Sequence, residues 1–296
     1  MCVFTVLLGA YEQLNEQFVA PESEIPFICF TDDPALRSGT WQMRLVSPLF
    51  GMDPIRSQRD LKLRPHIHLP DYDFSIYIDN SVLLTKPPEW ILERYRPASG
   101  FCLPRHSFQE SVLDEFLEVV KRGLDDQGRV FEQLNHYTLT HPQVLEEKPY
   151  WTGILLRNHT AHTVRAVMDI WSANVHRYSR RDQLSVNAAL SQVGLIPDVM
   201  DIDNYKSSFH AWPHTIGRKL DKGLVTPNEA ATISFSPPFA RVRMLEQQLA
   251  EITQASNDIL DSPAWRIGDK LSESARRHPW LLGLPLRVAR RILVRR

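Results

Sequence analysis

An acid and an amide stand where an apolar, strand-like segment of this chain ends. Phe74–Ile78 combines aromatic and β-branched residues and stops abruptly at Asp79, Asn80 and Ser81, which predicts a buried strand followed by a polar edge. Ligands of open α/β sheets bind beyond the carboxyl ends of the strands. Since oxygen donors suit Mg²⁺ or Mn²⁺, Asp79 and Asn80 could hold a cation against a diphosphate. The alternative is a tight turn, which all three residue types favour.

A basic segment precedes that strand. In a helix, Arg59, Lys62 and His66 would lie on one stripe, at spacings i, i+3 and i+7. Such a stripe could face a diphosphate. The alternative is a solvated basic face, which is the commoner meaning of a run of charges.

A second acid lies within a cationic segment, Ser179–Ser185. Ser179 and Asp182 have the spacing of a capping box ahead of an apolar helix. A capping box does not explain Arg180 and Arg181, because the helix macrodipole disfavours cations in a first turn. A nearby anion would resolve the conflict, and Asp182 could then orient or deprotonate an acceptor hydroxyl.

Two further segments carry groups suited to the same chemistry. His210–Lys219 predicts a loop in which His214 could complete a metal site with Asp79, while Lys219 could reach the diphosphate. A lone histidine is more often a surface or core residue, so both interpretations stay open. Trp151 begins a strand-like run and either offers a stacking face for a sugar or belongs to the core.

These residues must be positioned by a layered α/β fold. Strands are predicted at Val3–Leu8, Phe27–Phe30, Trp41–Val46, Phe74–Ile78 and Trp151–Leu156, separated by helical segments. Asp53 and Pro54 form a helix start, and further helices are predicted over about 109–122 and 161–177 and from near Arg181. Strands alternating with helices indicate a mostly parallel, mixed sheet flanked by helices.

The domain organisation follows from a change in character near Ser236. Residues 1–236 form the predicted α/β domain. Residues 237–262 form an amphipathic or short coiled-coil helix, with apolar residues spaced as in heptads at Val242, Leu245, Leu249, Ile252 and Ile259. Residues 263–296 form a basic amphipathic tail, which Ser262 and Pro263 separate from that helix.

Charge and cysteine usage narrow the classes of partner. Within the net charge of −1, residues 276–296 carry +7 and the rest of the chain −8. We therefore expect no nucleic-acid partner for the acidic body, and an anionic membrane surface for the tail. Cys2, Cys29 and Cys102 are scattered, which predicts buried thiols and fits a reducing cytoplasm. The first residues lack the basic lead of a signal peptide.

Several short motifs occur in the order typical of a known family. They are Phe27–Asp32, Lys62–His66, Tyr77–Ser81, Arg105–His106 and Arg181–Ser185. Together they resemble bacterial members of the glycosyltransferase-like family typified by plant mucilage-synthesis proteins. The resemblance covers roughly residues 1–215 and implies a GT-A-like, Rossmann-like fold that binds a nucleotide sugar. It departs from more distant relatives, which place two acids one residue apart, since here Asn80 and Ser81 follow Asp79.

The resemblance also implies roles for individual residues. The nucleotide pocket would comprise Gly9, Ala10, Tyr11, Thr31 and Asp32. Arg59, Lys62 and His66 would bind the diphosphate, with Lys219 and Asn80 nearby. Asp79 would be a metal or ribose ligand, with His214 as a second metal ligand, and Arg181, Asp182 and Gln183 would lie at the sugar or acceptor end.

The sequence therefore predicts a cytoplasmic glycosyltransferase, peripheral on the inner face of the plasma membrane. It would move a hexose from a nucleoside-diphosphate sugar to a cell-surface glycan or lipid-linked acceptor, with a divalent cation, Mn²⁺ or Mg²⁺, as cofactor. Two alternatives stay open. One is a metal-dependent hydrolase of a lipid or sugar, and the other is a degenerate GT-A domain that binds glycans or partners.

Overall fold

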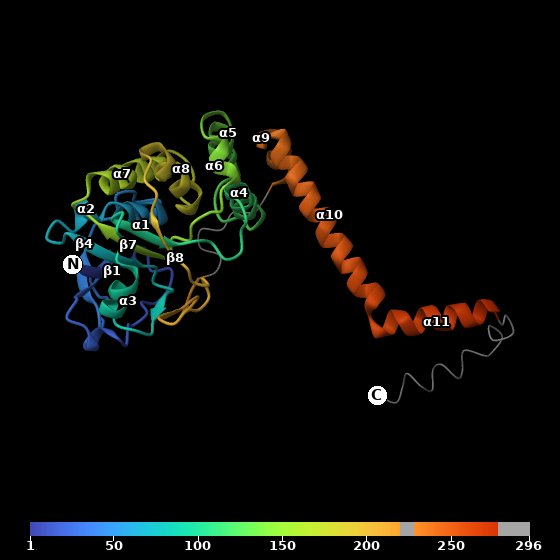
Figure 1. The fold of residues 1–296 in the computed structure, drawn as a ribbon, viewed down its shortest axis with the longest axis horizontal. Helices are drawn as coiled ribbons and strands as arrows, with labels where there is room; N and C mark the ends of the chain where they lie inside the picture. The colour runs from blue at the N-terminus through green and yellow to red at the C-terminus, as the bar shows by residue number, and fades with distance from the viewer. Residues whose placement is uncertain (220–227, 278–296) are drawn as a thin grey trace. The chain divides into compact units, whose positions relative to one another are not determined.

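The computed structural model describes residues 1–219 and 228–277. The chain divides into two compact units, Met1–Pro237 and the residues from Pro238 onward (Figure 1). The first unit carries all the strands among the described residues and all the predicted site residues.

A seven-stranded sheet forms the centre of the first unit in the described part of the chain, in the order β3-β2-β1-β4-β7-β6-β8. Its strands are β1 (Cys2–Leu7), β2 (Phe27–Thr31), β3 (Gln42–Leu45), β4 (Phe74–Ile78), β6 (Phe101–Pro104), β7 (Ile154–Asn158) and β8 (Asp198–Met200). Only β7 runs against its neighbours β4 and β6. A separate ribbon pairs β5 (Leu83–Leu84) with β9 (His210–Ala211). The predicted class, a mostly parallel mixed sheet flanked by helices, is confirmed.

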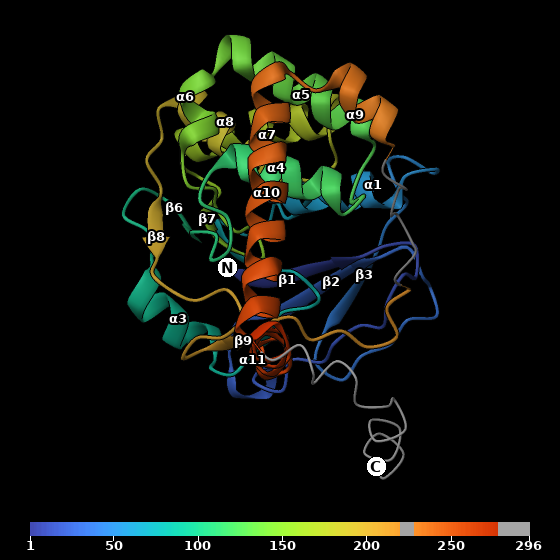
Figure 2. The same ribbon diagram turned by 90° about the vertical axis from the view of Figure 1, so that its right-hand side faces the viewer.

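Helices cover both faces of this sheet. The helices of the first unit are η1 (Ala20–Glu22), α1 (Pro54–Leu63), α2 (Pro65–His68), α3 (Pro88–Tyr95), α4 (Val112–Lys121), α5 (Gln127–Thr140), α6 (Pro142–Glu146), α7 (His162–Arg177), α8 (Gln183–Val193) and α9 (Glu229–Phe235). Figure 2 shows α1, α7 and α8 on one side of the strands and α3 on the other. The predicted start of α1 is confirmed, because the Asp53 carboxylate accepts a hydrogen bond from Arg56 N and Pro54 is the first helical residue.

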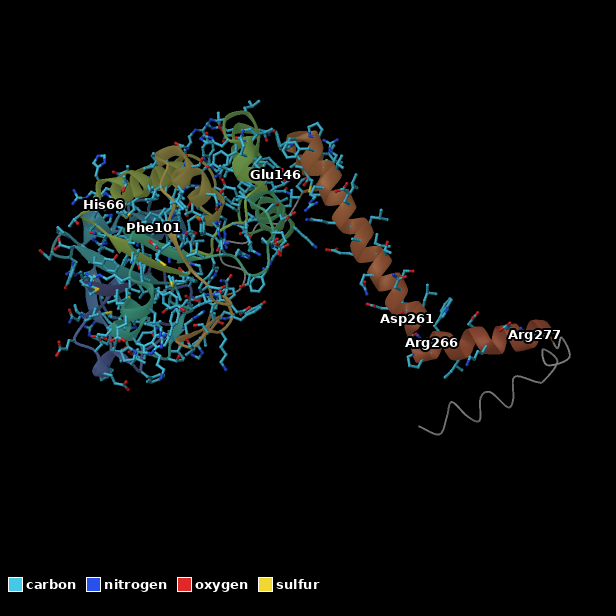
Figure 3. All side chains as sticks on the ribbon, viewed as in Figure 1. His66, Phe101, Glu146, Asp261, Arg266 and Arg277 are labelled. Carbon is cyan, nitrogen blue, oxygen red and sulfur yellow. The ribbon has the colours of Figure 1, made fainter. Side chains whose placement is uncertain are left out.

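Alternation along the strands creates two cores. In β1, Phe4 and Val6 face α1, α7 and α8, while Val3 and Leu7 face the opposite side with Trp41 and Ile91. Phe101 of β6 belongs to the first core (Figure 3). This period of two is what a sheet buried on both faces requires. All three cysteines are free and buried, as predicted.

The second unit is helical where the structure describes it. It comprises α10 (Pro238–Asp261) and α11 (Pro263–Arg277), with the break at Ser262 and Pro263 that the sequence predicts. The five predicted heptad residues of α10 are exposed. Among the described residues, no helix combines the length and apolar character needed to cross a bilayer. The predicted membrane-surface tail, 276–296, lies outside the described residues except for its first two positions, and the predicted domain boundaries stay predictions.

Candidate active site

The carboxyl ends of three parallel strands gather the predicted site residues at one edge of the sheet. Gly9 follows β1, Asp32 follows β2 and Asp79 follows β4, and β1 pairs in parallel with both other strands. Because β7 is antiparallel, the residues that precede it reach the same edge, and Asp79 N donates to the Gly153 carbonyl at 2.9 Å. The strand order thus brings together residues that are up to 144 positions apart.

Lys62 lies fully buried at the centre of this edge. Its Nζ is 2.6 Å from Asp182 Oδ2 and 3.4 Å from Asp79 Oδ1, and it donates to Thr152 Oγ1 at 3.3 Å. The ammonium group also lies 4.7 Å from the centre of the Tyr77 ring. A buried ammonium is stable only when it is paired and hydrogen-bonded. Lys62 therefore holds two carboxylates together rather than facing solvent.

Asp182 is the second carboxylate of this cluster. Its Oδ1 lies 3.1 Å from Arg59 Nε, and its Oδ2 accepts from Thr152 Oγ1 as well as from Lys62. Burial opposes ionisation, but the charges of Arg59 and Lys62 outweigh it and hold the pKa of Asp182 well below its usual range. An anchored, strongly acidic carboxylate is a poor acceptor for a hydroxyl proton, so the geometry argues against Asp182 as a base.

The predicted capping box at Ser179 and Asp182 does not form. Helix α8 begins only at Gln183, and the Asp182 side chain makes no cap hydrogen bond because it is turned to Arg59 and Lys62. Ser179 Oγ donates instead to Asp125 at 2.6 Å. The sequence predicted an anion near Arg180, and two carboxylates of the protein take this place. Asp125 and Asp53 both lie within 3.4 Å of the Arg180 guanidinium.

Asp79 is the partly exposed member of the cluster, with 29% of its side chain accessible. Its Oδ1 accepts from the Tyr77 hydroxyl at 2.6 Å and from Lys62. Burial, followed by the Asp79 charge, raises the pKa of Tyr77, which therefore stays a donor. Two donors on one oxygen fix the orientation of the carboxylate, while its accessible part faces the edge of the sheet.

The predicted nucleotide loop has the backbone expected of a tight turn after a strand. Gly9 and Ala10 have φ values of 72° and 47°, in the left-handed region. The Asp32 carboxylate accepts from Gly9 N through both oxygens, at 2.9 and 3.1 Å. Thr31 is buried, and its Oγ1 accepts from Asp33 N at 3.1 Å. These contacts fix the loop, and Tyr11 remains half-buried beside it.

The loop that contains His214 and Lys219 is tied to the same edge by its backbone. His214 N donates to the Ser81 carbonyl at 2.7 Å, and Lys219 N donates to the Tyr11 carbonyl at 2.8 Å. Gly217, with φ of 60°, packs against the Gln13 side chain. Both the His214 and Lys219 side chains are exposed. The loop therefore lies across the turns that follow β1 and β4.

Asn80 supports the site rather than lining it. It is buried, its amide nitrogen donates to Glu12 Oε1 and the Gln13 carbonyl, both at 2.8 Å, and its oxygen accepts from Asn15 N at 2.9 Å. Within residues 1–219 and 228–277, no group of three or more acidic, histidine or cysteine side chains could hold a metal ion. The donor set does not fit a cation held by the protein alone.

His66 does not join the predicted stripe. Helix α1 ends at Leu63, and a separate turn, α2, begins at Pro65, so the spacing of seven residues no longer places His66 above Arg59 and Lys62. The imidazole lies 3.2 Å from Asp169 of α7. The prediction that all three residues share one face is correct for Arg59 and Lys62, which both contact Asp182, and wrong for His66.

Glu115 of α4 is a buried acid beside the start of α8 that the sequence analysis missed. It accepts from Gln183 Nε2 at 2.9 Å, and His106 Nε2 lies 3.8 Å away. Burial raises the pKa of Glu115 to about 7, although Arg181 opposes the rise. An acid poised near neutral pH is suited to proton transfer. Glu115 sits in an ordinary amphipathic helix, and only its burial marks it.

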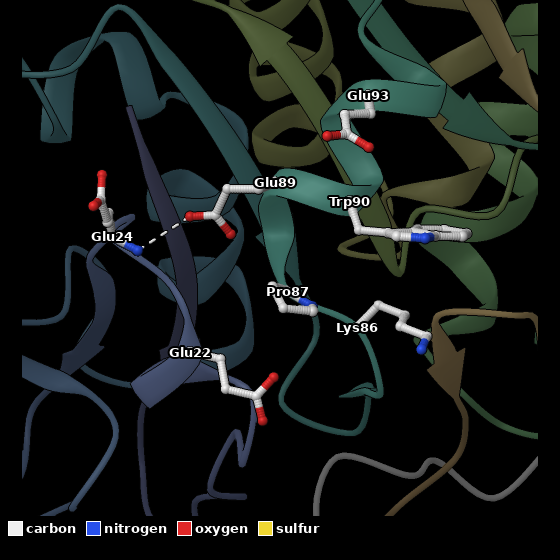
Figure 4. Close-up of a pocket in the computed structure, with 7 residues that line it drawn as sticks. All are labelled: Glu22, Glu24, Lys86, Pro87, Glu89, Trp90 and Glu93. Carbon is white, nitrogen blue, oxygen red and sulfur yellow. Dashed lines mark hydrogen bonds between the residues drawn. The ribbon is translucent and has the colours of Figure 1, made fainter.

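Helix α3 borders a different hollow of about 500 Å³. Figure 4 shows its lining, which comprises Glu22, Glu24, Lys86, Pro87, Glu89, Trp90 and Glu93. Four carboxylates against one ammonium would repel a diphosphate, and none of the predicted site residues lies there. The hollow is therefore not the candidate site.

The fold and this edge together define an α/β domain with a candidate ligand site at the carboxyl ends of its parallel strands. Residues 28–204 match the model of the family described as TOD1/MUCI70, glycosyltransferase-like domain. The chain belongs to this family, as its motifs predict. The matched range includes Asp32, Lys62, Asp79 and Asp182.

The individual proteins that the chain resembles have low sequence identity to it. Over 165 residues the chain is 27% identical to a probable hexosyltransferase, MUCI70, of Arabidopsis thaliana, and the match covers 52% of this chain and 28% of the plant protein. The chain thus spans less than a third of that relative. Two solved glycosyltransferases match with a TM-score of 0.38. The match to WbbM has 12% identity and covers 67% of this chain and 38% of WbbM. The match to mouse xyloside xylosyltransferase 1 has 11% identity and covers 66% of this chain and 81% of the mouse protein. The match to galactosyltransferase LgtC has 15% sequence identity and a TM-score of 0.39, and it covers 63% of this chain and 70% of LgtC.

Proposed function

We propose that this domain transfers a hexose from a nucleoside-diphosphate sugar to a glycan or glycolipid acceptor, with the donor lying over Asp79. The observation that carries the proposal is the Asp79 carboxylate itself. It is partly exposed where three parallel strands end, and Tyr77 and Lys62 fix its orientation. This is the position at which open α/β sheets bind nucleotides.

The charge balance of the cluster assigns the diphosphate to other residues. Arg59 and Lys62 carry two positive charges, and Asp79 and Asp182 carry two negative ones, so the four groups are neutral together. A diphosphate needs further positive charge. Lys219 supplies it, since its exposed side chain starts from a backbone held to Tyr11 in the predicted nucleotide loop.

At the other end of the site, Arg181 and Gln183 would meet the sugar or the acceptor. Burial, and then the charge of Arg59, lower the pKa of Arg181, so this arginine carries a charge that an anionic or hydroxyl-rich ligand would stabilise. Glu115, beside Gln183, is the acid suited to accept the proton of the acceptor hydroxyl. A divalent cation would enter with the donor diphosphate.

Isothermal titration with a panel of nucleoside-diphosphate sugars, with and without Mn²⁺, tests the proposal. We expect micromolar to millimolar binding that Lys219→Met weakens by about tenfold, whereas Lys86→Met in the acidic hollow leaves it unchanged. Absence of binding to every nucleotide sugar would contradict the proposal. Binding without sugar loss or transfer would favour a binding module, and lipid or sugar hydrolysis without nucleotide binding would favour a hydrolase.

A further inference from the structure

Three aromatic side chains form a continuous row on the surface of the first unit. The rings of Phe108 and Tyr205 are 4.5 Å apart, and those of Tyr205 and Trp212 are 5.8 Å apart at an angle of 32°. Phe108 is 41% exposed and Tyr205 is 53% exposed, while Trp212 is half-buried. We call Phe108, Tyr205 and Trp212 the aromatic row. Exposed aromatic rings in direct contact are a feature of binding surfaces.

A buried asparagine holds the row rigid. Asn204 is fully buried, its side chain accepts from Ser107 N at 2.7 Å and donates to the Arg105 carbonyl at 2.9 Å, and its own N donates to Ser107 Oγ. Trp212 N donates to the Tyr205 carbonyl at 2.7 Å. The segments that carry the three rings are therefore locked together before any ligand arrives, which lowers the entropic cost of binding.

The row connects to the candidate site at both ends. Trp212 Nε1 donates to Ser81 Oγ at 3.1 Å, in the turn that follows Asp79. At the other end, His106 Nδ1 accepts from Phe108 N at 3.2 Å and from Gln109 N, so the ring hydrogen is on Nε2, which faces Glu115 at 3.8 Å. Trp151, for which the sequence left a stacking face and a core position open, is buried and packs edge-on against Trp212 at 5.5 Å. Trp151 thus supports the row from the core.

We propose that the aromatic row binds the pyranose rings of the glycan acceptor. The proposal rests on the proposed function, because it places the acceptor beside the site of sugar transfer. A pyranose presents an apolar C–H face to an aromatic ring and hydroxyls at its rim. The exposed side chains of Asp203 and Lys206 flank Tyr205 and offer one acceptor and one donor group for those hydroxyls. A hydrophobic lipid chain would offer neither group a hydrogen-bond partner.

Saturation-transfer NMR on the full chain tests this proposal, with defined tetrasaccharides of glucose, galactose, mannose, rhamnose and xylose as probes. We expect at least one tetrasaccharide to bind, and Tyr205→Ala combined with Phe108→Ala to weaken it by about tenfold or more. Tyr205→Phe, which keeps the ring, should bind within about threefold of the wild type. The matched control is Phe235→Ala on α9, which removes a similarly exposed ring outside the row.

Titration of a nucleoside-diphosphate sugar into the same variants separates the two proposals. Unchanged donor binding with lost tetrasaccharide binding supports the aromatic row as acceptor site. Tetrasaccharide binding that is equal in the wild type and in the double variant overturns it, as does failure of the wild type to bind any probe while donor binding is intact. If the wild type binds lipid vesicles but no tetrasaccharide, and the double variant no longer binds the vesicles, the aromatic row binds a lipid and the proposal is overturned. Absent donor binding would instead contradict the proposed function.

Discussion

Replacing Lys62 by methionine tests the cluster on which the site is built. The substitution keeps the length of a fully buried side chain but removes the charge that lies 2.6 Å from Asp182 and 3.4 Å from Asp79. Arg59, with a weaker contribution from Arg181 at Asp182, then faces the two carboxylates. Removing one partner of a buried ion pair costs about 3–5 kcal/mol. For a unit of this size, each kcal/mol corresponds to about 2–4 °C in Tm, so we expect a fall of roughly 6–20 °C.

Thermal and urea denaturation followed by circular dichroism would measure this loss. Lys148→Met is the matched control, because its ion pair with Glu110 at 3.3 Å is exposed and is worth about 0–1 kcal/mol. Asp182→Asn added to Lys62→Met should recover part of the loss, since it removes the excess negative charge that the loss of Lys62 leaves in the cluster. A Lys62→Met variant as stable as the Lys148→Met control would refute the account of the cluster.

The loss should also depend on pH. The lowered pKa of Asp182, to which Lys62 contributes, stabilises the fold above the ordinary value of 3.8 and ceases to do so as pH falls through the folded-state pKa. The difference between wild type and Lys62→Met should therefore shrink below pH 3.8. A difference that grows on acidification would contradict the pairing of Lys62 with Asp182.

Three further predictions concern other parts of the chain. Glu115→Gln should gain stability relative to the wild type as pH rises from 4.5 to about 7, because the raised pKa makes ionisation of Glu115 costly; denaturation midpoints that stay parallel across this range would contradict it. Arg157→Met should raise the free energy of unfolding by about 1–3 kcal/mol, because Arg157 is fully buried and its Nε and Nη2 have no hydrogen-bond partner among the residues that the structure describes; urea denaturation checks this, and a loss of stability would refute it. Deleting 276–296, with its seven arginines, should abolish cosedimentation with anionic liposomes, and unchanged cosedimentation would count against a membrane role.

The sequence predicts the strand ends of this site well, for a physical reason. The predicted strands that precede Gly9, Asp32 and Asp79 are short apolar runs bounded by polar or turn-forming residues, and parallel strands present their carboxyl ends at one edge. Local patterning thus suffices for these positions. It fails for β6, a short strand with proline as its last residue, and for α5, whose start at Gln127 lies in a segment of turn-forming residues.

Pairing across long separations could not be predicted. Lys62 and Asp182 are 120 positions apart, and no local pattern shows that their side chains meet. The sequence therefore suggested that Asp182 belongs either to a capping box or to the acceptor end of the site, and that Lys62 binds phosphate. The sequence did not predict the burial of Glu115 either, because Glu115 is only one of several acidic residues in α4. The prediction that His66 lies on one stripe with Arg59 and Lys62 failed for a local reason. Pro65 begins a new helical turn, which ends the register of α1.

The central claim is that Asp79 takes part in sugar transfer while the buried pair of Lys62 and Asp182 maintains the site. Release of nucleoside diphosphate from the nucleotide sugar that binds best, measured for wild type and for Asp79→Asn, tests it most directly. We predict a loss of at least about 100-fold in turnover with an unchanged circular dichroism spectrum. Turnover equal to the wild type in a folded Asp79→Asn variant would contradict the account.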